Sequence, residues 1–96
     1  MQEKEIELFI LAALRELQTN SGRLWIDLDP DSLPLRDLDG FDSLSAVEVT
    51  AAMEQKLECH FETESIFVSS DGKRALIVKQ ITEVVAKATA SKGNAT

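Results

Sequence analysis

The sequence holds a single cysteine, Cys59, so no disulfide can form within the chain and cysteine usage does not indicate a redox compartment. The N-terminus is charged and has no signal-type apolar run, and no segment approaches the roughly 20 apolar residues that a membrane-spanning helix needs. Internal repeats and low-complexity tracts are also missing. We therefore expect one cytoplasmic domain in residues 1–90, without membrane insertion, followed by a frayed polar tail in residues 91–96.

Positive charge is scarce in the middle of the chain. The whole sequence has 17 acidic and 10 basic residues, which gives a formal net charge of −7. Between Asp27 and Glu64 there are eleven acids and only two bases, Arg36 and Lys56. Such an acidic region repels nucleic acid and anionic membranes and attracts basic protein surfaces. We expect a protein partner and no nucleic acid.

The chain has one histidine, His60, and therefore only one conventional base that could activate a serine nucleophile. The most prominent serine, Ser43, lacks the two flanking glycines of a nucleophile elbow. The alternating carboxylates of residues 27–31 do not begin a calcium loop, because Ser32 stands where that loop requires glycine and Leu38 stands where it requires glutamate. We expect neither an enzyme nor a metal site.

The sequence is rich in apolar residues at helical spacing. We predict main helices over residues 3–18, 43–58 and 75–88. The connection of residues 23–42 contains both prolines and has no helical period, so we expect it to pack on the core, with room for one short helical turn. Residues 61–67 are a second candidate for a single turn. The predicted fold is all-α: a small bundle of three main helices plus one short helix, with a long loop between the first and second main helices.

The second predicted helix has two different faces. One is a core stripe at helical spacing, made of Ala46, Val49, Met53 and Leu57. The neighbouring face mixes apolar and acidic residues: Leu44, Val47, Glu48, Ala51, Glu54 and Glu58. That face is consistent with simple solvation of the helix, and equally with a docking surface for short-lived contacts with basic partners. The acids near Ser43 favour docking, and we expect Glu48 and Glu54 to face solvent.

Two residues compete to cap this helix. If Asp42 is the N-cap, Ser43 becomes the first helical residue, with its hydroxyl pointing outward beside unpaired amides and the positive end of the helix dipole. A phosphodiester suits that position. However, Ser45 and Glu48 have the spacing of a capping box, which would make Ser45 the N-cap and Ser43 an ordinary loop serine. The residues alone support both readings equally.

Residues 36–44, which read Arg-Asp-Leu-Asp-Gly-Phe-Asp-Ser-Leu and are followed by Val47 and Glu48, resemble the acyl carrier protein family. That family includes the related carrier domains of polyketide and peptide synthases. The Asp-Ser-Leu triplet alone recurs by chance. Together with the Gly-Phe lead-in, the helix pattern, the acidity and the length, it makes a strong signal, and the similarity extends over most of the chain.

The resemblance implies that Ser43 accepts 4′-phosphopantetheine from coenzyme A, with Asp42 helping to position the transfer. A separate magnesium-dependent phosphopantetheinyl transferase (a holo-acyl carrier protein synthase) would attach this arm. The terminal thiol of the arm would then hold an acyl or aminoacyl group as a thioester. Acyl or aminoacyl ligases, ketosynthases or acyltransferases would dock on a monomeric carrier through Leu44, Val47, Glu48, Ala51 and Glu54.

Three departures from the family pattern point to a specialised, freestanding carrier, whose cargo could be fatty acyl, polyketide or aminoacyl. Phe61-Glu62 stands where the family commonly has Ile-Pro, and Gln55 and Lys56 dilute an acidic run. Residues 65–74 form a longer stretch than in the fatty-acid carriers. An alternative from another class is an unmodified acidic helical adaptor that binds a basic protein partner through the same face.

Overall fold

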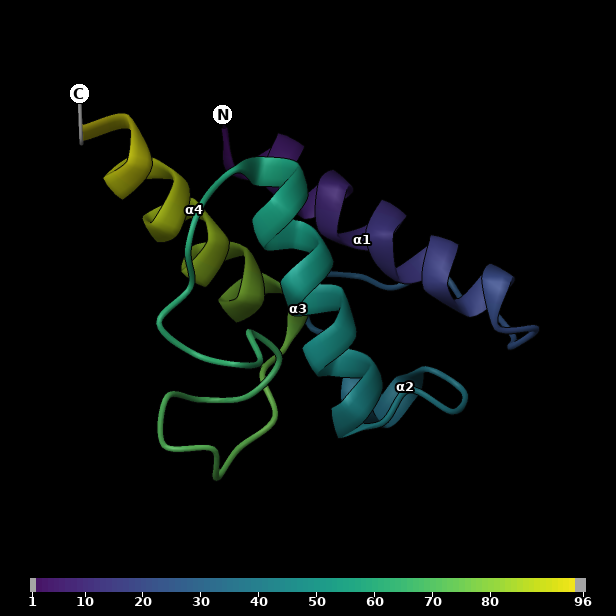
Figure 1. The fold of residues 1–96 in the computed structure, drawn as a ribbon. Coiled ribbons are helices and arrows are strands. Elements are labelled where there is room, and N and C mark those ends of the chain that lie inside the picture. Colours follow the sequence, from purple (N-terminus) through teal and green to yellow (C-terminus); the bar gives the residue numbers. More distant parts are fainter. Residues whose placement is uncertain (1, 95–96) are drawn as a thin grey trace.

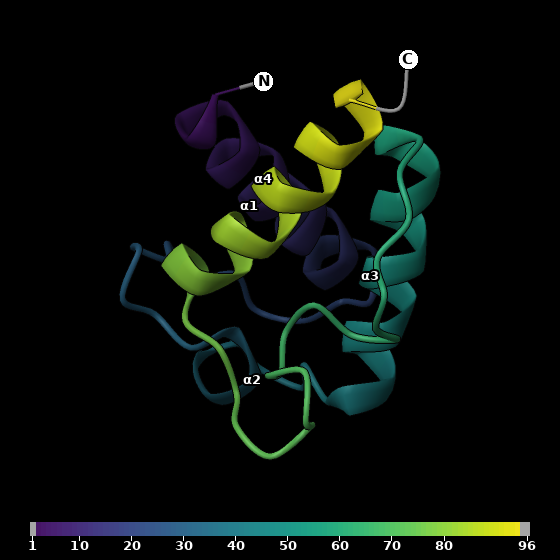
Figure 2. The same cartoon turned by 90° about the vertical axis from the view of Figure 1, so that its left-hand side faces the viewer.

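The computed structural model describes residues 2–94, with the side chains of residues 2–90. Helix α1 packs against both α3 and α4 (Figures 1 and 2). The described residues contain no strand. The four helices in chain order are α1 (Glu3–Asn20), α2 (Pro34–Asp37), α3 (Ser43–Leu57) and α4 (Val78–Asn94). The predicted all-α class is confirmed, with three main helices, one short helix and a long loop between α1 and α3.

Helix α1 follows its predicted pattern. Ile6, Ile10 and Leu14 recur every four residues and are all buried, so this stripe forms one face of the core. The helix ends two residues later than predicted, at Asn20, and Gly22 then takes the left-handed conformation, with φ +70°. Only glycine adopts that conformation without strain, which explains why the chain turns away there.

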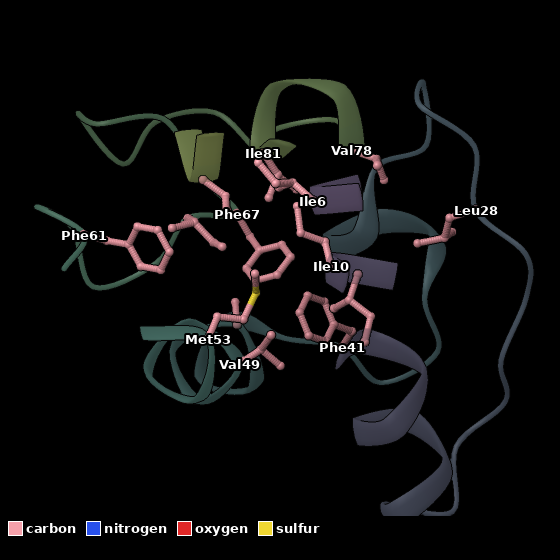
Figure 3. Close-up of a cluster of buried hydrophobic side chains, with 14 of the residues drawn as sticks. Ile6, Ile10, Leu28, Phe41, Val49, Met53, Phe61, Phe67, Val78 and Ile81 are labelled. Atoms are coloured by element: carbon pink, nitrogen blue, oxygen red, sulfur yellow. The ribbon is translucent and has the colours of Figure 1, made fainter. Parts of the chain in front are cut away.

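The hydrophobic core lies between the three main helices and the irregular segment of residues 61–77 (Figure 3). Val49 and Met53 come from α3, and Ile81 comes from α4. Phe67, from the irregular segment, meets Phe41 edge to face, with ring centroids 5.2 Å apart and planes at 76°. Such aromatic pairs add about 0.5–1.5 kcal/mol beyond their buried area. The residue pair therefore joins the irregular segment to the lead-in of α3.

The single helical turn expected in residues 61–67 is not formed, so that prediction is wrong. Side-chain oxygens take the amides that a helical turn would have used. Thr50 Oγ1 in α3 accepts from the Ile66 amide at 3.1 Å, and Ser65 Oγ accepts from the Phe67 amide at 3.2 Å. Thr63 and Ser65 also bond to each other through hydroxyl and carbonyl. Such local bonds compete with helix formation.

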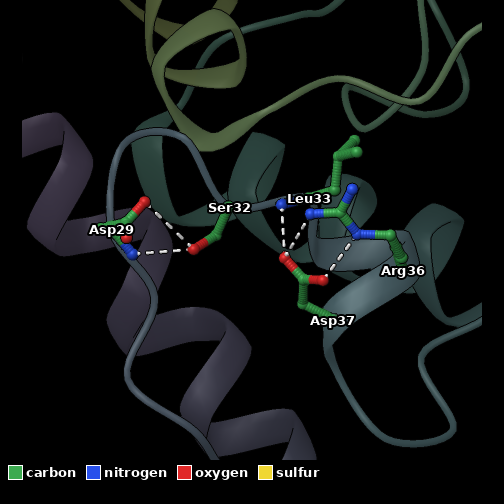
Figure 4. A network of polar contacts seen from close by, with 5 residues as sticks. All are labelled: Asp29, Ser32, Leu33, Arg36 and Asp37. Carbon is green, nitrogen blue, oxygen red and sulfur yellow. Dashed lines mark hydrogen bonds and ion pairs between the residues drawn. The ribbon is translucent and has the colours of Figure 1, made fainter.

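The short helix lies instead in the long connection, as α2 (Figure 4). Pro34 occupies its first position, where the missing amide hydrogen does no harm. The Asp37 carboxylate accepts from the Leu33 amide at 2.9 Å and pairs with Arg36 at 2.8 Å. The hydrogen bond from Arg36, and then the one from Leu33, lower the pKa of Asp37.

Helix α4 begins at Val78 and extends to Asn94, whereas the sequence pattern placed it over residues 75–88. Its start is later because the Leu76 amide bonds to the Phe67 carbonyl and keeps the preceding residues extended. The amides of Val78 and Lys79 then donate to the Ser32 and Pro30 carbonyls, both at 2.9 Å. These bonds satisfy first-turn amides that a helix leaves unpaired.

The later end of α4 changes our expectation for the C-terminal tail. Residues 91–94, which we expected to be frayed, continue the helix, and residues 95–96 lie outside the described part of the chain. The Thr89 hydroxyl donates back to the Val85 carbonyl at 3.1 Å within the helix. Gly93 is the only residue of very low helix propensity among residues 89–94, and it stands next to the end of the helix. Propensity therefore gives no reason for an earlier end.

The arrangement of the helices gives the molecule two distinct ends. Both views place α2, the N-terminal end of α3 and the turn around residues 69–74 at one end (Figures 1 and 2). The C-terminal ends of α3 and α4 lie at the other. Within the described residues, no helix is long and apolar enough to cross a membrane.

Candidate functional site

Asp42 is the residue that caps α3. Its Oδ1 accepts a hydrogen bond from the Ser45 amide at 2.9 Å, and its backbone is extended, as an N-cap requires. The Asp42 carbonyl accepts from the Ala46 amide at 3.0 Å and so begins the helical ladder. The alternative interpretation, with Ser45 as the cap, is therefore wrong.

Ser43 is consequently the first residue of α3, and it is exposed. Among the described residues, nothing forms a hydrogen bond with its hydroxyl. The first amides of a helix have no carbonyl partner within the helix, and the helix dipole adds positive potential there. An accessible hydroxyl at this position can be modified by an external enzyme without breaking any bond of the fold.

Arg23, from the loop after α1, engages the hydroxyl of Ser45, the residue that does not cap the helix. Its Nη1 donates to Ser45 Oγ at 3.2 Å, and Ser45 is buried. The Arg23 side chain crosses Gly40, where an added Cβ would lie 2.9 Å from Arg23 Nε. Gly40 has φ +66°, so both its conformation and this close approach require glycine. The guanidinium is thus a fixed positive charge at the start of α3.

The Asp42 carboxylate titrates at lower pH than a free one. The hydrogen bonds from Ser45 are the main cause of its lowered pKa, and the charge of Arg23 contributes further. Asp42 is therefore ionised at neutral pH and accepts, rather than donates, at the cap.

Gln18 also positions the lead-in to Ser43, and sequence reasoning missed it. It is fully buried, and its Nε2 donates to the Leu24 carbonyl at 3.0 Å and to the Asp39 carbonyl at 2.7 Å. One side chain of α1 thereby holds both ends of the long connection. Gln18 lies four residues after Leu14 on the buried stripe, and that spacing is the signal that could have identified it.

Four of the five predicted docking residues form an exposed surface on α3. Leu44 is 68% exposed and Val47 36%. Glu48 and Ala51 are also exposed. We call Leu44, Val47, Glu48 and Ala51 the α3 surface. It begins directly beside Ser43 and combines apolar area with negative charge, as transient docking surfaces do.

Glu54 differs from the solvent-facing position that we expected. Its side chain is only 28% exposed, and its Oε2 accepts from the Phe61 amide at 2.9 Å and lies 3.2 Å from His60 Nδ1. The carboxylate therefore holds the start of the irregular segment against α3. A substitution at Glu54 would change the fold locally, so Glu54 is a poor probe of docking.

His60 cannot act as a base for Ser43. It follows the C-terminal end of α3, whereas Ser43 begins that helix, and a 15-residue helix is about 22 Å long. The carboxylates of the long connection are also engaged locally: Asp29 Oδ1 accepts from the Asp31 amide and from the Ser32 hydroxyl. Among the described residues, no cluster of three or more His, Cys, Asp or Glu side chains could hold a metal ion.

Comparison of the chain with protein-family models, with curated proteins and with solved structures gives no match.

Proposed function

We propose that this protein is an acyl carrier protein of the cytoplasm, with Ser43 as the attachment point of a 4′-phosphopantetheine arm taken from coenzyme A. The observation that carries this proposal is the exposed, unbonded Ser43 hydroxyl at the first position of a helix capped by Asp42. The carrier-like pattern of residues 36–44 supports the same assignment. The protein acts as a carrier and depends on other enzymes for every chemical step.

The surroundings of Ser43 fit a phosphodiester. The amides of Ser43 and Leu44 belong to the first turn of α3, where negative charge is stabilised by the unpaired amides and the helix dipole. The guanidinium of Arg23 adds a positive charge, held through its bond to Ser45. These groups offset the negative charge of Asp42, whose carboxylate is turned to the Ser45 amide.

In the transfer, Ser43 Oγ bonds to the phosphorus that carries the pantetheine of coenzyme A, and the bond from that phosphorus to the departing adenosine 3′,5′-bisphosphate breaks. The hydroxyl proton passes to a base of the transferase, since His60 lies beyond the other end of α3. Asp42 holds the first turn so that the hydroxyl stays outward. The arm, once bound, supplies a terminal thiol that holds acyl or aminoacyl groups as thioesters.

The α3 surface supports exchange between partners. Leu44 and Val47 offer a small apolar area, and Glu48 offers a charge that steers basic enzymes toward it. Contacts of this size are weak, so partners dissociate quickly and each can meet the arm in turn. Ligases, ketosynthases and acyltransferases are the classes of enzyme that such a carrier serves.

The deciding experiment is modification in vitro. We expect the protein, incubated with coenzyme A, magnesium and a promiscuous phosphopantetheinyl transferase, to gain the mass of one phosphopantetheine. Ser43→Ala should abolish the gain, whereas Ser70→Ala, which removes another exposed serine, should retain it. Intact-mass spectrometry measures both.

The same experiment separates the carrier from the unmodified acidic adaptor. An adaptor would use the same exposed face but would show no mass gain with any transferase. A gain that persists in Ser43→Ala would contradict the assignment of the attachment point.

A further inference from the structure

Residues 68–75 leave the body of the protein and return to the same place. The Leu76 amide donates to the Phe67 carbonyl at 2.9 Å, and an isolated bridge joins Val68 to Ala75. Phe67 is buried, whereas residues 70–75 are all exposed. Because the two ends lie within hydrogen-bonding distance of each other, a shorter turn could connect the core with α4. We call residues 69–74 the cationic turn, for the charges described below.

Side chains hold the cationic turn in one shape. The Ser69 hydroxyl donates to Asp71 Oδ1 and accepts from the Arg74 amide at 3.1 Å, and Asp71 Oδ1 also accepts from the Lys73 amide at 3.0 Å. Gly72 supplies the left-handed conformation at the tip, with φ +73°. Ordering such a turn costs conformational entropy, which a simple link between two segments would not require.

The turn carries two adjacent cations at the end of the molecule where Ser43 lies. Lys73 and Arg74 are exposed, and neither forms an ion pair among the described residues. The only acid of the turn, Asp71, is held by the bonds just described and keeps its negative charge, so two positive charges stand against one negative charge. Both views place the turn and the N-terminal end of α3 at the same end of the molecule (Figures 1 and 2).

This position matters because the rest of the lead-in to α3 is acidic. Asp39 and Asp42 are both exposed there. The donor that Ser43 must meet, coenzyme A, is a polyanion with a diphosphate and a separate 3′-phosphate. The amides of the first turn and Arg23 act on the phosphorus at Ser43, whereas the 3′-phosphate lies farther from them, where exposed cations elsewhere at the same end can attract it.

We propose that the cationic turn faces the 3′-phosphate of coenzyme A bound to the transferase and thereby favours docking of the donor-loaded enzyme. This inference rests on the proposed function of Ser43. The diphosphate of coenzyme A must meet the Ser43 hydroxyl itself. Lys73 and Arg74 lie apart from Ser43, so they suit the 3′-phosphate, which is farther from the reacting bond. The matching partner is a transferase that leaves the 3′-phosphate accessible at its surface.

The test compares rates of modification by the same promiscuous transferase. We expect Lys73→Glu/Arg74→Glu to lower kcat/KM for the carrier roughly tenfold at low salt, the lower end of electrostatic steering effects. The neutral variant Lys73→Gln/Arg74→Gln should lie between it and the natural protein. The differences should vanish at 1 M NaCl, where the Debye length is about 3 Å.

A matched control changes the same number of charges elsewhere. Lys4 and Arg15 are exposed bases on α1, so Lys4→Glu/Arg15→Glu alters the net charge equally and should leave kcat/KM within about twofold of the natural value. Circular dichroism and a urea transition should show that all variants keep the fold. Replacing coenzyme A by dephospho-coenzyme A, which lacks the 3′-phosphate, should remove most of the penalty of the Lys73→Glu/Arg74→Glu variant.

The outcomes separate this inference from the proposed function. If the natural protein gains no mass, the carrier function itself fails. If it is modified but Lys73→Glu/Arg74→Glu and the α1 control behave alike, the cationic turn has no role in docking. A penalty that persists undiminished with dephospho-coenzyme A would overturn the assignment to the 3′-phosphate and indicate an acidic protein surface instead.

Discussion

The lead-in to α3 and the segment of residues 61–77 are both irregular, and both bury apolar side chains before they expose polar ones. The lead-in, residues 38–42, buries Leu38 and Phe41 and then exposes the Ser43 hydroxyl. The other segment buries Phe61, Ile66 and Phe67 and then exposes a turn. In both segments, hydrogen bonds between side chains and backbone groups replace the helical bonds and fix the backbone.

Each segment has both local and distant holding bonds, since Gln18 reaches Asp39 in the lead-in and Ser65 binds the nearby Phe67 amide, but the bonds at Ser45 and Ile66 differ clearly in origin. The bond that caps α3 is local, since Asp42 and Ser45 are three residues apart. The bond that holds Ile66 comes from Thr50, sixteen residues earlier. Local bonds are visible as sequence motifs, whereas bonds between distant residues require the folded chain. The sequence therefore offered the cap of α3 as one of two candidates, whereas it gave no sign of the bond that holds Ile66.

The largest expected effect comes from the aromatic contact that joins the two segments. Phe67→Ala should lower the free energy of unfolding by about 3–5 kcal/mol, because Phe67 is fully buried and its removal leaves a cavity beside Phe41. A urea denaturation curve measures the loss. Leu8→Ala, at a side chain that is 54% exposed on α1, should cost far less. Equal losses in the two variants would show that the segments do not share this contact.

A smaller effect should follow from breaking the distant bond of the irregular segment. The Thr50 hydroxyl accepts from the Ile66 amide and donates to the Ala46 carbonyl at 2.8 Å. Thr50→Val keeps the shape but leaves a buried amide unpaired, which should cost about 1–3 kcal/mol in urea denaturation. Hydrogen exchange at the Ile66 amide should accelerate.

Thr50→Ser is the control for that prediction, because it retains the hydroxyl. Its Ile66 amide should exchange more slowly than in Thr50→Val. If both variants lost the same protection, the methyl group rather than the hydroxyl would hold the segment.

The smallest effect is expected at the local cap. Asp42→Ala should lower the midpoint of urea unfolding at neutral pH, by less than Thr50→Val does, because the Asp42 carboxylate is exposed and its cap bond already competes with water. The folded-state pKa of Asp42 is lowered, chiefly by the bonds from Ser45. The stability that its ionised form contributes is therefore present above the ordinary aspartate range and is lost as the pH falls through the lowered pKa.

This sign gives the cap a pH-dependent signature. The difference in stability between the natural protein and Asp42→Ala should shrink as the pH is lowered. The difference between Asp42→Asn and Asp42→Ala should show no such trend, because neither variant has a carboxylate at residue 42. A difference that stayed constant down to acid pH would contradict the ionised cap.

Much of α1 and α3 could be predicted, but two details of the candidate site could not. The apolar stripes predicted both helices, and the Asp-Ser-Leu pattern indicated Ser43 as a candidate. The choice between Asp42 and Ser45 as the cap stayed open, because both residues have the spacing of a cap. In the folded chain Arg23, 22 residues away, donates to the Ser45 hydroxyl instead. Glu54 was expected to face solvent, because its partner lies beyond the end of the helix and cannot be recognised from the helical pattern. In the structure its carboxylate accepts from the Phe61 amide.

The sequence by itself determined the all-α class, the acidic middle of the chain and the presence of a helix starting near Ser43. These properties depend on composition and on interactions within about four residues, which repeat along the chain and can be read from it. Only the tertiary structure decided that Asp42 is the cap, that residues 61–67 form no helical turn, and that the turn of residues 69–74 lies at the same end as Ser43. The choice of cap needed the structure because two residues three positions apart both had cap spacing. The other two features depend on contacts between residues far apart in the sequence, such as Thr50 with Ile66, which exist only once the chain has folded.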